Sequence, residues 1–230
     1  MIKDSPVLTI RRNFGRPDKA KIQPFENVST GFVVDSQGGT GALDYRIKPL
    51  EDDSSSKFVG VAVTCQAAPS DNLAAHGAID LAGPGDVLVV ATGGYTGAAV
   101  IGDNMAHMAK NKGVVAIVTD GVLRDLPGLS EVGIPMFCRG ISPNSPARNG
   151  PGTVGLPVTL GGVSVLPGDL VVGDRDGVVV ISQEDLSRVI IELKEVRQIE
   201  AAMEAKVKGG LAVNDSIREL LGSDKVRNLD

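Results

Sequence analysis

Hydrophobic residues in the first half of the chain gather in short, nearly continuous runs that predict buried strands. The runs span residues 58–67, 86–91 and 114–118, and each is rich in valine and other aliphatic side chains. Such runs are typical of strands covered on both faces. Helices are predicted between and before them, each followed by a glycine-containing turn, at residues 26–36, 73–81 and about 103–112. This alternation predicts an α/β fold in which helices cover a sheet.

The pattern changes after Pro135, where short apolar runs alternate with glycine and proline turns. These runs predict strands at 135–138, 155–159, 163–166, 169–172 and 178–181. Ser182-Gln183-Glu184-Asp185 then resembles a capping box with Asp in place of the usual Glu, and it predicts a long helix over 183–208. Apolar residues at helical spacing support this helix: Leu186, Val189, Ile190, Leu193, Val196 and Met203. The second half is therefore expected to be strand-rich, followed by one long helix.

Composition and charge narrow the class of protein. Hydrophobic residues make up 42% and charged residues 22% of the chain, which is typical of a globular protein. Aromatic residues are only 3% and the net charge is −5, so neither a stacking platform nor a basic surface for nucleic acid is expected. Residues 1–24 are polar and contain Pro6, Pro17 and Pro24, which predicts an arm rather than core.

Cysteine usage and hydropathy suggest a compartment. Cys65 and Cys138 lie far apart and form no CxxC pair, so neither a disulfide framework nor a zinc knuckle is expected, and a reducing cytoplasm is the default. The first residues contain no apolar segment of a signal peptide. No apolar run approaches the roughly 20 residues that cross a bilayer. We therefore expect a cytoplasmic protein without a membrane partner.

A glycine-rich stretch before one predicted helix is the first candidate site. Thr92-Gly93-Gly94-Tyr95-Thr96-Gly97 leads to Gly102-Asp103, where the helix begins. The free N–H groups of Gly102, Asp103, Asn104 and Met105 would face an anion there, assisted by the helix dipole. The alternative is an ordinary glycine turn. The spacing matches neither GxGxxG nor GxxxxGK[ST], so nucleotide binding is not indicated.

The second candidate follows the third strand, at Arg124-Asp125. Twenty residues separate Asp103 from Arg124, and ligands of open α/β layers bind at the carboxyl ends of such strands. Asp103, Arg124 and Asp125 are therefore expected at one rim, although an Arg beside an Asp is also a common solvated pair. Carboxylates bind a hard cation such as Mg²⁺, and Arg presents a planar fork to a carboxylate. Together, these carboxylates and the Arg124 guanidinium predict a site for a 2-oxo acid chelated to a metal ion.

Other candidate residues have weaker support. His107 lies four residues after Asp103 and His76 in a short predicted helix, and a solvated or partly buried structural role is the simpler interpretation of both. HExxH and GxSxG are absent from the sequence, and no lysine stands alone in an apolar strand as a Schiff-base lysine prefers. Glu200 falls between Val196 and Met203 beside the apolar stripe of the long helix. It is either a carboxylate at an interface or a solvated residue at the edge of the stripe.

Three stretches of sequence are similar to one known family. They read GDNMAHMAKNKGVVAIVTDGVLRD from Gly102, IPMFCRGISP from Ile134 and PVTLGGVSVLPGDLVVGDRDGVVVI from Pro157. They resemble the class II pyruvate aldolases that cleave 4-hydroxy-4-methyl-2-oxoglutarate and 4-carboxy-4-hydroxy-2-oxoadipate. The proteins called regulator of ribonuclease activity A belong to the same group. The resemblance covers residues 25–210.

The resemblance implies a layered β/β/α sandwich similar to the swivelling phosphohistidine domain, with a long C-terminal helix. It divides the chain into an N-terminal arm (1–24), a single catalytic domain (25–210) and a C-terminal tail (211–230). It also implies homotrimers or hexamers with the site at a subunit boundary, and a Mg²⁺ or Mn²⁺ cofactor. The activity implied is release of pyruvate from 4-hydroxy-2-oxo acids, with oxaloacetate decarboxylation as a side activity. The alternative is a non-catalytic regulator that binds a ribonuclease or helicase.

The resemblance also assigns roles. Asp125 is implied as the direct metal ligand, and Asp103 as a residue that acts through a water on the metal and in proton transfer. Arg124 would bind the pyruvyl end and offset enolate charge, while the backbone of residues 102–105 would hold the substrate carboxylate. A glutamate from the neighbouring subunit's long helix completes the water shell of the metal in this family. Glu200 matches that position, with Glu204 as the rival.

Overall fold

The computed structural model describes residues 6–51 and 56–229. Its helices are α1 (Lys19–Ile22), the 3-10 helix η1 (Gln23–Phe25), α2 (Thr30–Ser36), α3 (Leu73–Leu81), α4 (Asp103–Asn111), α5 (Leu126–Val132), α6 (Leu186–Lys208) and α7 (Asp215–Leu221). Its strands are β1 (Thr9–Ile10), β2 (Lys48–Pro49), β3 (Phe58–Ala67), β4 (Asp86–Ala91), β5 (Ala99–Ile101), β6 (Ala116–Thr119), β7 (Val122–Leu123), β8 (Met136–Cys138), β9 (Gly152–Val154), β10 (Val158–Leu160), β11 (Val163–Val165), β12 (Leu170–Asp174) and β13 (Gly177–Ile181). Among the described residues, no helix combines the length and the apolar character needed to cross a membrane.

A large sheet runs through the centre of the molecule in the order β1-β9-β3-β4-β6-β8-β2. β3, β4, β6 and β8 are parallel neighbours, and β12 pairs antiparallel with β3 and with β13. The bounds predicted for β3, β4 and α3 are confirmed. The third strand begins at Ala116, two residues later than predicted. The strand starts later because the Val114 N–H donates to Ala109 O at 3.1 Å, a hydrogen bond that belongs to the C-terminal end of α4.

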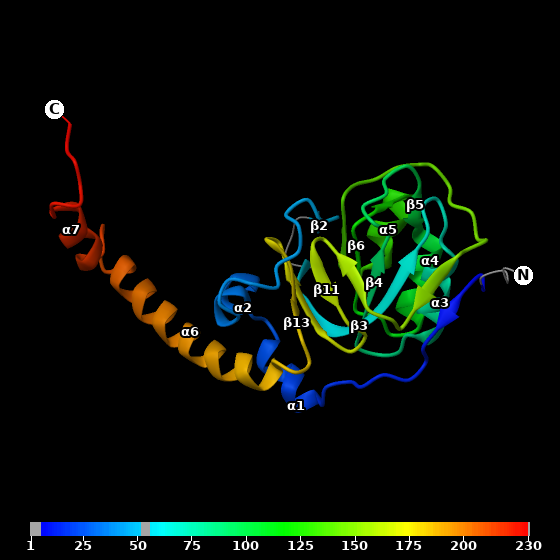
Figure 1. The fold of residues 1–230 in the computed structure, drawn as a ribbon, viewed down its shortest axis with the longest axis horizontal. Coiled ribbons are helices and arrows are strands. Elements are labelled where there is room, and N and C mark those ends of the chain that lie inside the picture. The colour runs from blue at the N-terminus through cyan, green and yellow to red at the C-terminus, as the bar shows by residue number, and fades with distance from the viewer. Residues whose placement is uncertain (1–5, 52–55, 230) are drawn as a thin grey trace, which may run out of the picture.

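Successive side chains along the central strands point to opposite faces of the sheet, and both faces are buried. Leu88 and Val90 of β4 face a core shared with α3, α4 and α5. Val87 and Val89 face a second core, shared with the β10–β11 hairpin, β12 and β13. Figure 1 shows the helices on one side of β4 and β6 and the additional strands on the other. The layered β/β/α arrangement implied by the family resemblance is confirmed.

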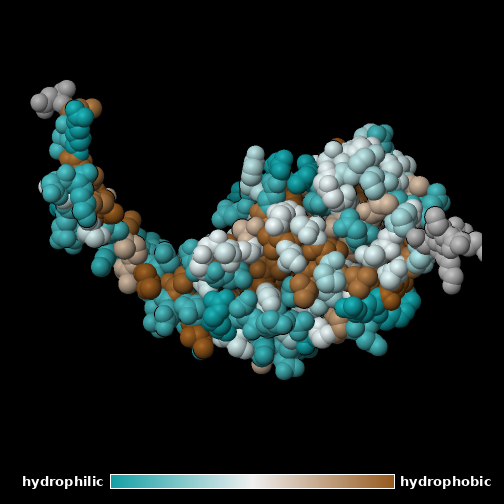
Figure 2. Space-filling view, in the orientation of Figure 1, coloured by the Kyte–Doolittle hydropathy of each residue, from teal (hydrophilic) through white to brown (hydrophobic). Residues whose placement is uncertain are grey.

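The long helix α6 leaves this body. Its buried residues are Leu186, Val189 and Leu193, which pack with α2 against β12 and β13. Beyond them the helix projects from the molecule, as Figure 1 shows, and Ile199 is 64% exposed. Figure 2 shows hydrophobic side chains along this projecting helix. The amphipathic stripe predicted for this helix is thus covered only over its first two turns.

The start of α6 differs from the prediction. The helix begins at Leu186, three residues later than predicted, and its N-cap residue is Asp185, whose side chain makes no capping hydrogen bond. The Ser182 hydroxyl instead accepts from Glu184 N at 3.2 Å, two residues on. The capping-box interpretation is therefore wrong, because the serine stabilises a turn that precedes the helix.

Two further predicted bounds are wrong for identifiable reasons. The helix predicted from residue 26 begins at Thr30, where the Asp174 carboxylate accepts from both Thr30 N (2.8 Å) and Thr30 Oγ1 (2.7 Å). The strand predicted at 155–159 begins only at Val158, as β10, because Gly155 directly after β9 adopts a left-handed conformation with φ of 65°. Both differences arise from tertiary contacts or turns that a local apolar pattern does not reveal.

The N-terminal segment contributes more to the fold than its polar composition predicts. β1 pairs parallel with β9, with Thr9 opposite Thr153. Leu8, Ile10 and Phe14 are partly buried against the helix-side core. These few apolar side chains in an otherwise polar stretch suffice to attach it to the body of the molecule.

Candidate active site

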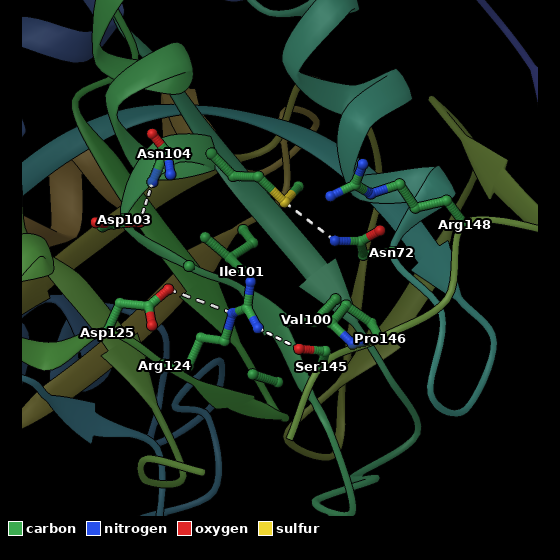
Figure 3. Close-up of a pocket in the computed structure, with 13 residues that line it drawn as sticks. Asn72, Val100, Ile101, Asp103, Asn104, Arg124, Asp125, Ser145, Pro146 and Arg148 are labelled. Carbon is green, nitrogen blue, oxygen red and sulfur yellow. Dashed lines mark hydrogen bonds and ion pairs between the residues drawn. The ribbon is translucent and has the colours of Figure 1, made fainter. Parts of the chain in front are cut away.

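A cavity of about 190 Å³ lies where α4 begins, beside β5 and β7 (Figure 3). The residues that line it are Asn72, Ala99, Val100, Ile101, Gly102, Asp103, Asn104, Met105, Arg124, Asp125, Ser145, Pro146 and Arg148. The residues predicted from the glycine stretch and from the Arg124-Asp125 pair thus meet in one pocket. A cavity of this size suits a small acid better than a drug-sized ligand.

A short parallel ladder brings the two predicted motifs together. β5 pairs with β7, so that Ile101 lies opposite Leu123. Gly102 and Arg124 therefore leave adjacent strands at the same edge, and Arg124 N donates to Ile101 O at 3.2 Å. Neither short strand was predicted, although the sequence did predict that the motifs share a rim.

Asp125 has an unusual backbone that directs its side chain to the pocket. Its φ of 65° and ψ of 47° are left-handed, a conformation uncommon for residues other than glycine and concentrated at functional sites. It is the N-cap residue of α5, yet its carboxylate makes no capping hydrogen bond. That carboxylate lies 3.3 Å from Arg124 Nε and remains 43% exposed. It is therefore available to a ligand or cation.

Arg124 is fixed on both sides of its guanidinium. Nε faces the Asp125 carboxylate, and Nη1 donates to the Ser145 hydroxyl. With its side chain 32% exposed, Arg124 still presents part of the fork to the pocket. Such a pre-positioned cation is suited to bind a carboxylate or a developing oxyanion.

Two glycines leave room for the carboxylates of Asp125 and Asp103, each of which lies against the helix that the other residue precedes or begins. A β-carbon on Gly102 would lie 2.5 Å from Asp125 Oδ2, and one on Gly128 would lie 2.6 Å from Asp103 Oδ2. Asp125 thus sits against the start of α4, and Asp103 against the first turns of α5. Both carboxylates lie near helix N-termini, whose partial positive charge favours negative groups.

One of the N–H groups expected to bind an anion already has a partner. Asn104 N donates to Asp103 Oδ1 at 2.6 Å. The Met105 side chain is buried, and its sulfur accepts from Asn72 Nδ2 at 3.1 Å. The start of α4 therefore contributes both backbone donors and a buried wall to the pocket.

The donor set fits a hydrated divalent cation. Asp103 and Asp125 supply hard oxygen ligands on an accessible rim, and Mg²⁺ commonly binds through one or two carboxylates while keeping several waters. Within residues 6–51 and 56–229, no cluster of three or more His, Cys, Asp or Glu side chains could hold a metal. One chain thus offers part of a coordination shell rather than a closed cage.

The two predicted glutamates do not line the pocket of their own chain. Both lie on the projecting part of α6 and are exposed. Glu204 is paired with Lys208 at 2.5 Å within the helix, and this hydrogen bond lowers the pKa of Glu204. Glu200 has no hydrogen bond or ion pair to another described residue. Within the described part of its own chain, Glu200 therefore takes no part in the pocket.

The pocket also contains residues that the sequence did not single out. Asn72 precedes α3, and Ser145 and Arg148 belong to the loop between β8 and β9. No motif or periodicity marks them, because they reach the pocket through long-range contacts. The histidines considered earlier lie outside it: His107 is exposed on α4, and burial lowers the pKa of His76, assisted by the positive charge of Arg148.

Comparison with known proteins adds independent findings. The model of the RraA-like family, described as Aldolase/RraA, matches residues 26–180. A Halalkalibacterium halodurans protein provisionally named 4-hydroxy-4-methyl-2-oxoglutarate aldolase is 36% identical over 186 residues, covering 81% of this chain and 88% of that protein. A Thermus thermophilus protein named 4-hydroxy-4-methyl-2-oxoglutarate aldolase is 34% identical over 113 residues, covering 49% of this chain and 69% of that protein.

A solved structure shares the fold. The Streptomyces coelicolor protein described as an unusual member of the RNase ES inhibitor RraA protein family has a TM-score of 0.73 and 30% sequence identity. The similarity covers 83% of this chain and 100% of that chain. The similar proteins thus include both proteins named as aldolases and a member of a family named for ribonuclease inhibition.

Proposed function

The chain belongs to the RraA-like family, and on that premise we propose that it is a divalent-metal-dependent class II aldolase. It would cleave 4-hydroxy-2-oxo acids, such as 4-hydroxy-4-methyl-2-oxoglutarate or 4-carboxy-4-hydroxy-2-oxoadipate, to pyruvate and a second oxo acid. The observation that supports this most is the meeting of Asp103, Arg124 and Asp125 in one small pocket. A protein that acted only by docking would have no need of a cation held beside the Asp125 carboxylate in a pocket that Asp103 also lines.

The residues of the pocket suggest how cleavage proceeds. Arg124 binds the pyruvyl end and offsets the negative charge that develops on its 2-oxo oxygen as the C3–C4 bond breaks. Backbone N–H groups at the start of α4 bind the substrate carboxylate. A base removes the C4 hydroxyl proton as the C3–C4 bond breaks, and Asp103, at the rim, passes a proton through water to C3 of the resulting enolate. Asp125 would hold Mg²⁺ or Mn²⁺, which supplies Lewis acidity toward the 2-oxo group.

Oxaloacetate decarboxylation would follow from the same arrangement, because loss of its C4 carboxylate also leaves the pyruvate enolate. Stabilisation of that charge by Arg124 serves both reactions. We therefore include this side activity in the proposal.

The proposal extends to assembly as a homotrimer or hexamer. Glu200 lies on a helix that leaves its own body, with exposed apolar residues such as Ile191 and Ile199 along it. A neighbouring copy that covers this helix would bring Glu200 toward the incomplete carboxylate set of Asp103 and Asp125. Glu200 would then act on the cation through water.

The second candidate is a regulator that binds a ribonuclease or helicase without catalysis. The observation that favours it is the similarity to the Streptomyces coelicolor RNase ES inhibitor family member. The two candidates differ in one property, since only an aldolase needs the chemistry of the pocket.

Pyruvate release distinguishes the candidates. The purified protein is mixed with 4-hydroxy-4-methyl-2-oxoglutarate, 4-carboxy-4-hydroxy-2-oxoadipate or oxaloacetate, with and without Mg²⁺. We expect pyruvate with Mg²⁺ or Mn²⁺, none in excess EDTA, and recovery when metal is restored. Full activity in EDTA, or inactivation by borohydride in the presence of pyruvate, would contradict metal dependence. Lack of turnover on all three acids would favour the regulator.

A further inference from the structure

The loop between β8 and β9 crosses one side of the pocket and is tied to the start of α3. Ala147 N donates to Ser70 O at 2.7 Å, and Asn72 N donates to Ala147 O at 3.0 Å. The backbone on either side of Asp71 is thus joined to the loop. This part of the loop is held at a defined position rather than free to move away.

A buried carboxylate secures the next residues of the same loop. Asp71, only 6% exposed, accepts from Asn149 N at 2.5 Å and from Gly150 N at 3.1 Å. Charge-assisted hydrogen bonds of this kind are stronger than neutral ones. Arg148 therefore lies between two anchored residues, and its backbone is fixed beside the pocket.

The Arg148 side chain presents an uncompensated positive charge to the pocket. Its guanidinium has no hydrogen bond or ion pair to another described residue. Figure 3 shows it directed from the loop toward the Asn72 amide, whereas Arg124 lies on the side of Asp125. An unpaired guanidinium facing a small polar cavity is suited to bind an anionic group of a ligand.

Asn72 has an unused hydrogen-bonding atom at the same end. The residue is 3% exposed, and its Oδ1 has no hydrogen-bond partner among the residues that the structure describes. Its Nδ2 donates to the Met105 sulfur, which is a weak acceptor. A buried acceptor left unpaired is unfavourable, so native structures nearly always supply a donor. A ligand hydroxyl would be such a donor.

We propose that Arg148 and Asn72 bind the far end of the substrate. Arg148 pairs with a second carboxylate, and Asn72 Oδ1 accepts a hydrogen bond from the hydroxyl on the neighbouring carbon. The inference rests on the proposed function, since Arg124 must bind the pyruvyl end. With one cation at each end, the pocket selects 4-hydroxy-2-oxo acids that carry two carboxylates. Asn72 orients the hydroxyl, and a different group takes its proton, because an amide is not a base at neutral pH.

Substrates with and without the second carboxylate test the role of Arg148. Cleavage of 4-hydroxy-4-methyl-2-oxoglutarate and of 4-hydroxy-2-oxopentanoate is measured for the wild type and for Arg148→Met. The loss of one charge-assisted pair should lower kcat/KM on the dicarboxylate roughly 10- to 100-fold. The monocarboxylate should change by less than about twofold. The matched control is Arg12→Met, which removes a 62% exposed guanidinium paired with Asp80 and should alter neither.

Binding without turnover separates this inference from the proposed reaction. Calorimetry with Mg²⁺ compares 2-oxoglutarate, which has a distal carboxylate, with 2-oxobutanoate, which has none. The wild type should prefer 2-oxoglutarate, and Arg148→Met should lose that preference. If Arg148→Met loses the preference for 2-oxoglutarate but the wild type cleaves no substrate, the carboxylate-binding role of Arg148 is supported and the proposed aldolase reaction is contradicted. If the wild type has no preference, or Arg148→Met weakens both acids equally, the assignment of Arg148 is wrong.

The role of Asn72 has its own readout. Asn72→Leu keeps the side-chain volume but removes the acceptor, so kcat/KM on the hydroxylated dicarboxylate should fall roughly tenfold. Binding of 2-oxoglutarate, which has no hydroxyl, should change little. A parallel loss of 2-oxoglutarate binding would show that Asn72 only maintains the shape of the pocket and would overturn its assignment.

Discussion

Replacing Gly102 with alanine should inactivate the pocket without weakening the fold. The new β-carbon would lie 2.5 Å from Asp125 Oδ2 and 3.1 Å from Arg124 Nε, whereas ordinary contacts begin at 3.4 Å. The carboxylate must therefore move by about 0.9 Å (3.4 − 2.5), which displaces it from its position 3.3 Å from Arg124 Nε. Because a displacement of about 1 Å at a reacting centre costs on the order of 100-fold in rate, kcat/KM should fall by about that factor.

The backbone at Gly102 separates this effect from misfolding. Its φ of −116° and ψ of −178° are extended and open to any residue. Alanine at a compatible position stabilises a protein by roughly 0.4–1 kcal/mol through the unfolded state. The variant should therefore melt at or above the wild-type temperature while losing activity. Half-saturation with Mg²⁺ should also require more metal, since Asp125 is displaced.

Pyruvate release coupled to NADH oxidation by lactate dehydrogenase measures the activity, and circular dichroism measures Tm. The control is Gly31→Ala in α2, where the nearest atom to the new β-carbon is 3.7 Å away. That variant should keep full activity. Retention of more than a third of wild-type activity by Gly102→Ala would refute the argument from crowding. A fall in Tm would instead assign the loss of activity to folding.

Three further outcomes are expected. Arg124→Lys keeps the charge but loses the planar fork, so kcat should drop roughly 100-fold; a change in KM alone would reduce Arg124 to a carboxylate clamp. Inactive Asp125→Ala and Glu200→Ala chains, mixed under proven subunit exchange, should regain activity if the site is shared between copies, and continued inactivity would contradict sharing. Burial raises the pKa of both Cys65 and Cys138, so neither thiol should react with Ellman's reagent before denaturation; rapid labelling of the folded protein would contradict the buried thiols.

Local patterns in the sequence determined much of the fold's first half. The aliphatic runs of β3 and β4 and the helix α3 were predicted at their observed bounds, because strand periodicity and glycine stops act over a few residues. The sequence also predicted Asp103, Arg124 and Asp125 on one rim, although the strands that directly precede them, β5 and β7, were not predicted. The metal and aldolase roles of these residues remain predictions.

Only the tertiary structure decided how the pocket is completed. The β5–β7 ladder, the left-handed Asp125 and the loop that delivers Arg148 each depend on contacts between segments distant in the chain. The hydrogen bond from Asn149 N to the Asp71 carboxylate joins residues 78 positions apart in the sequence, and no local pattern encodes such a contact. The sequence therefore determines the reactive end of the candidate site, while the end that recognises the rest of a ligand exists only once the loop is folded across α3.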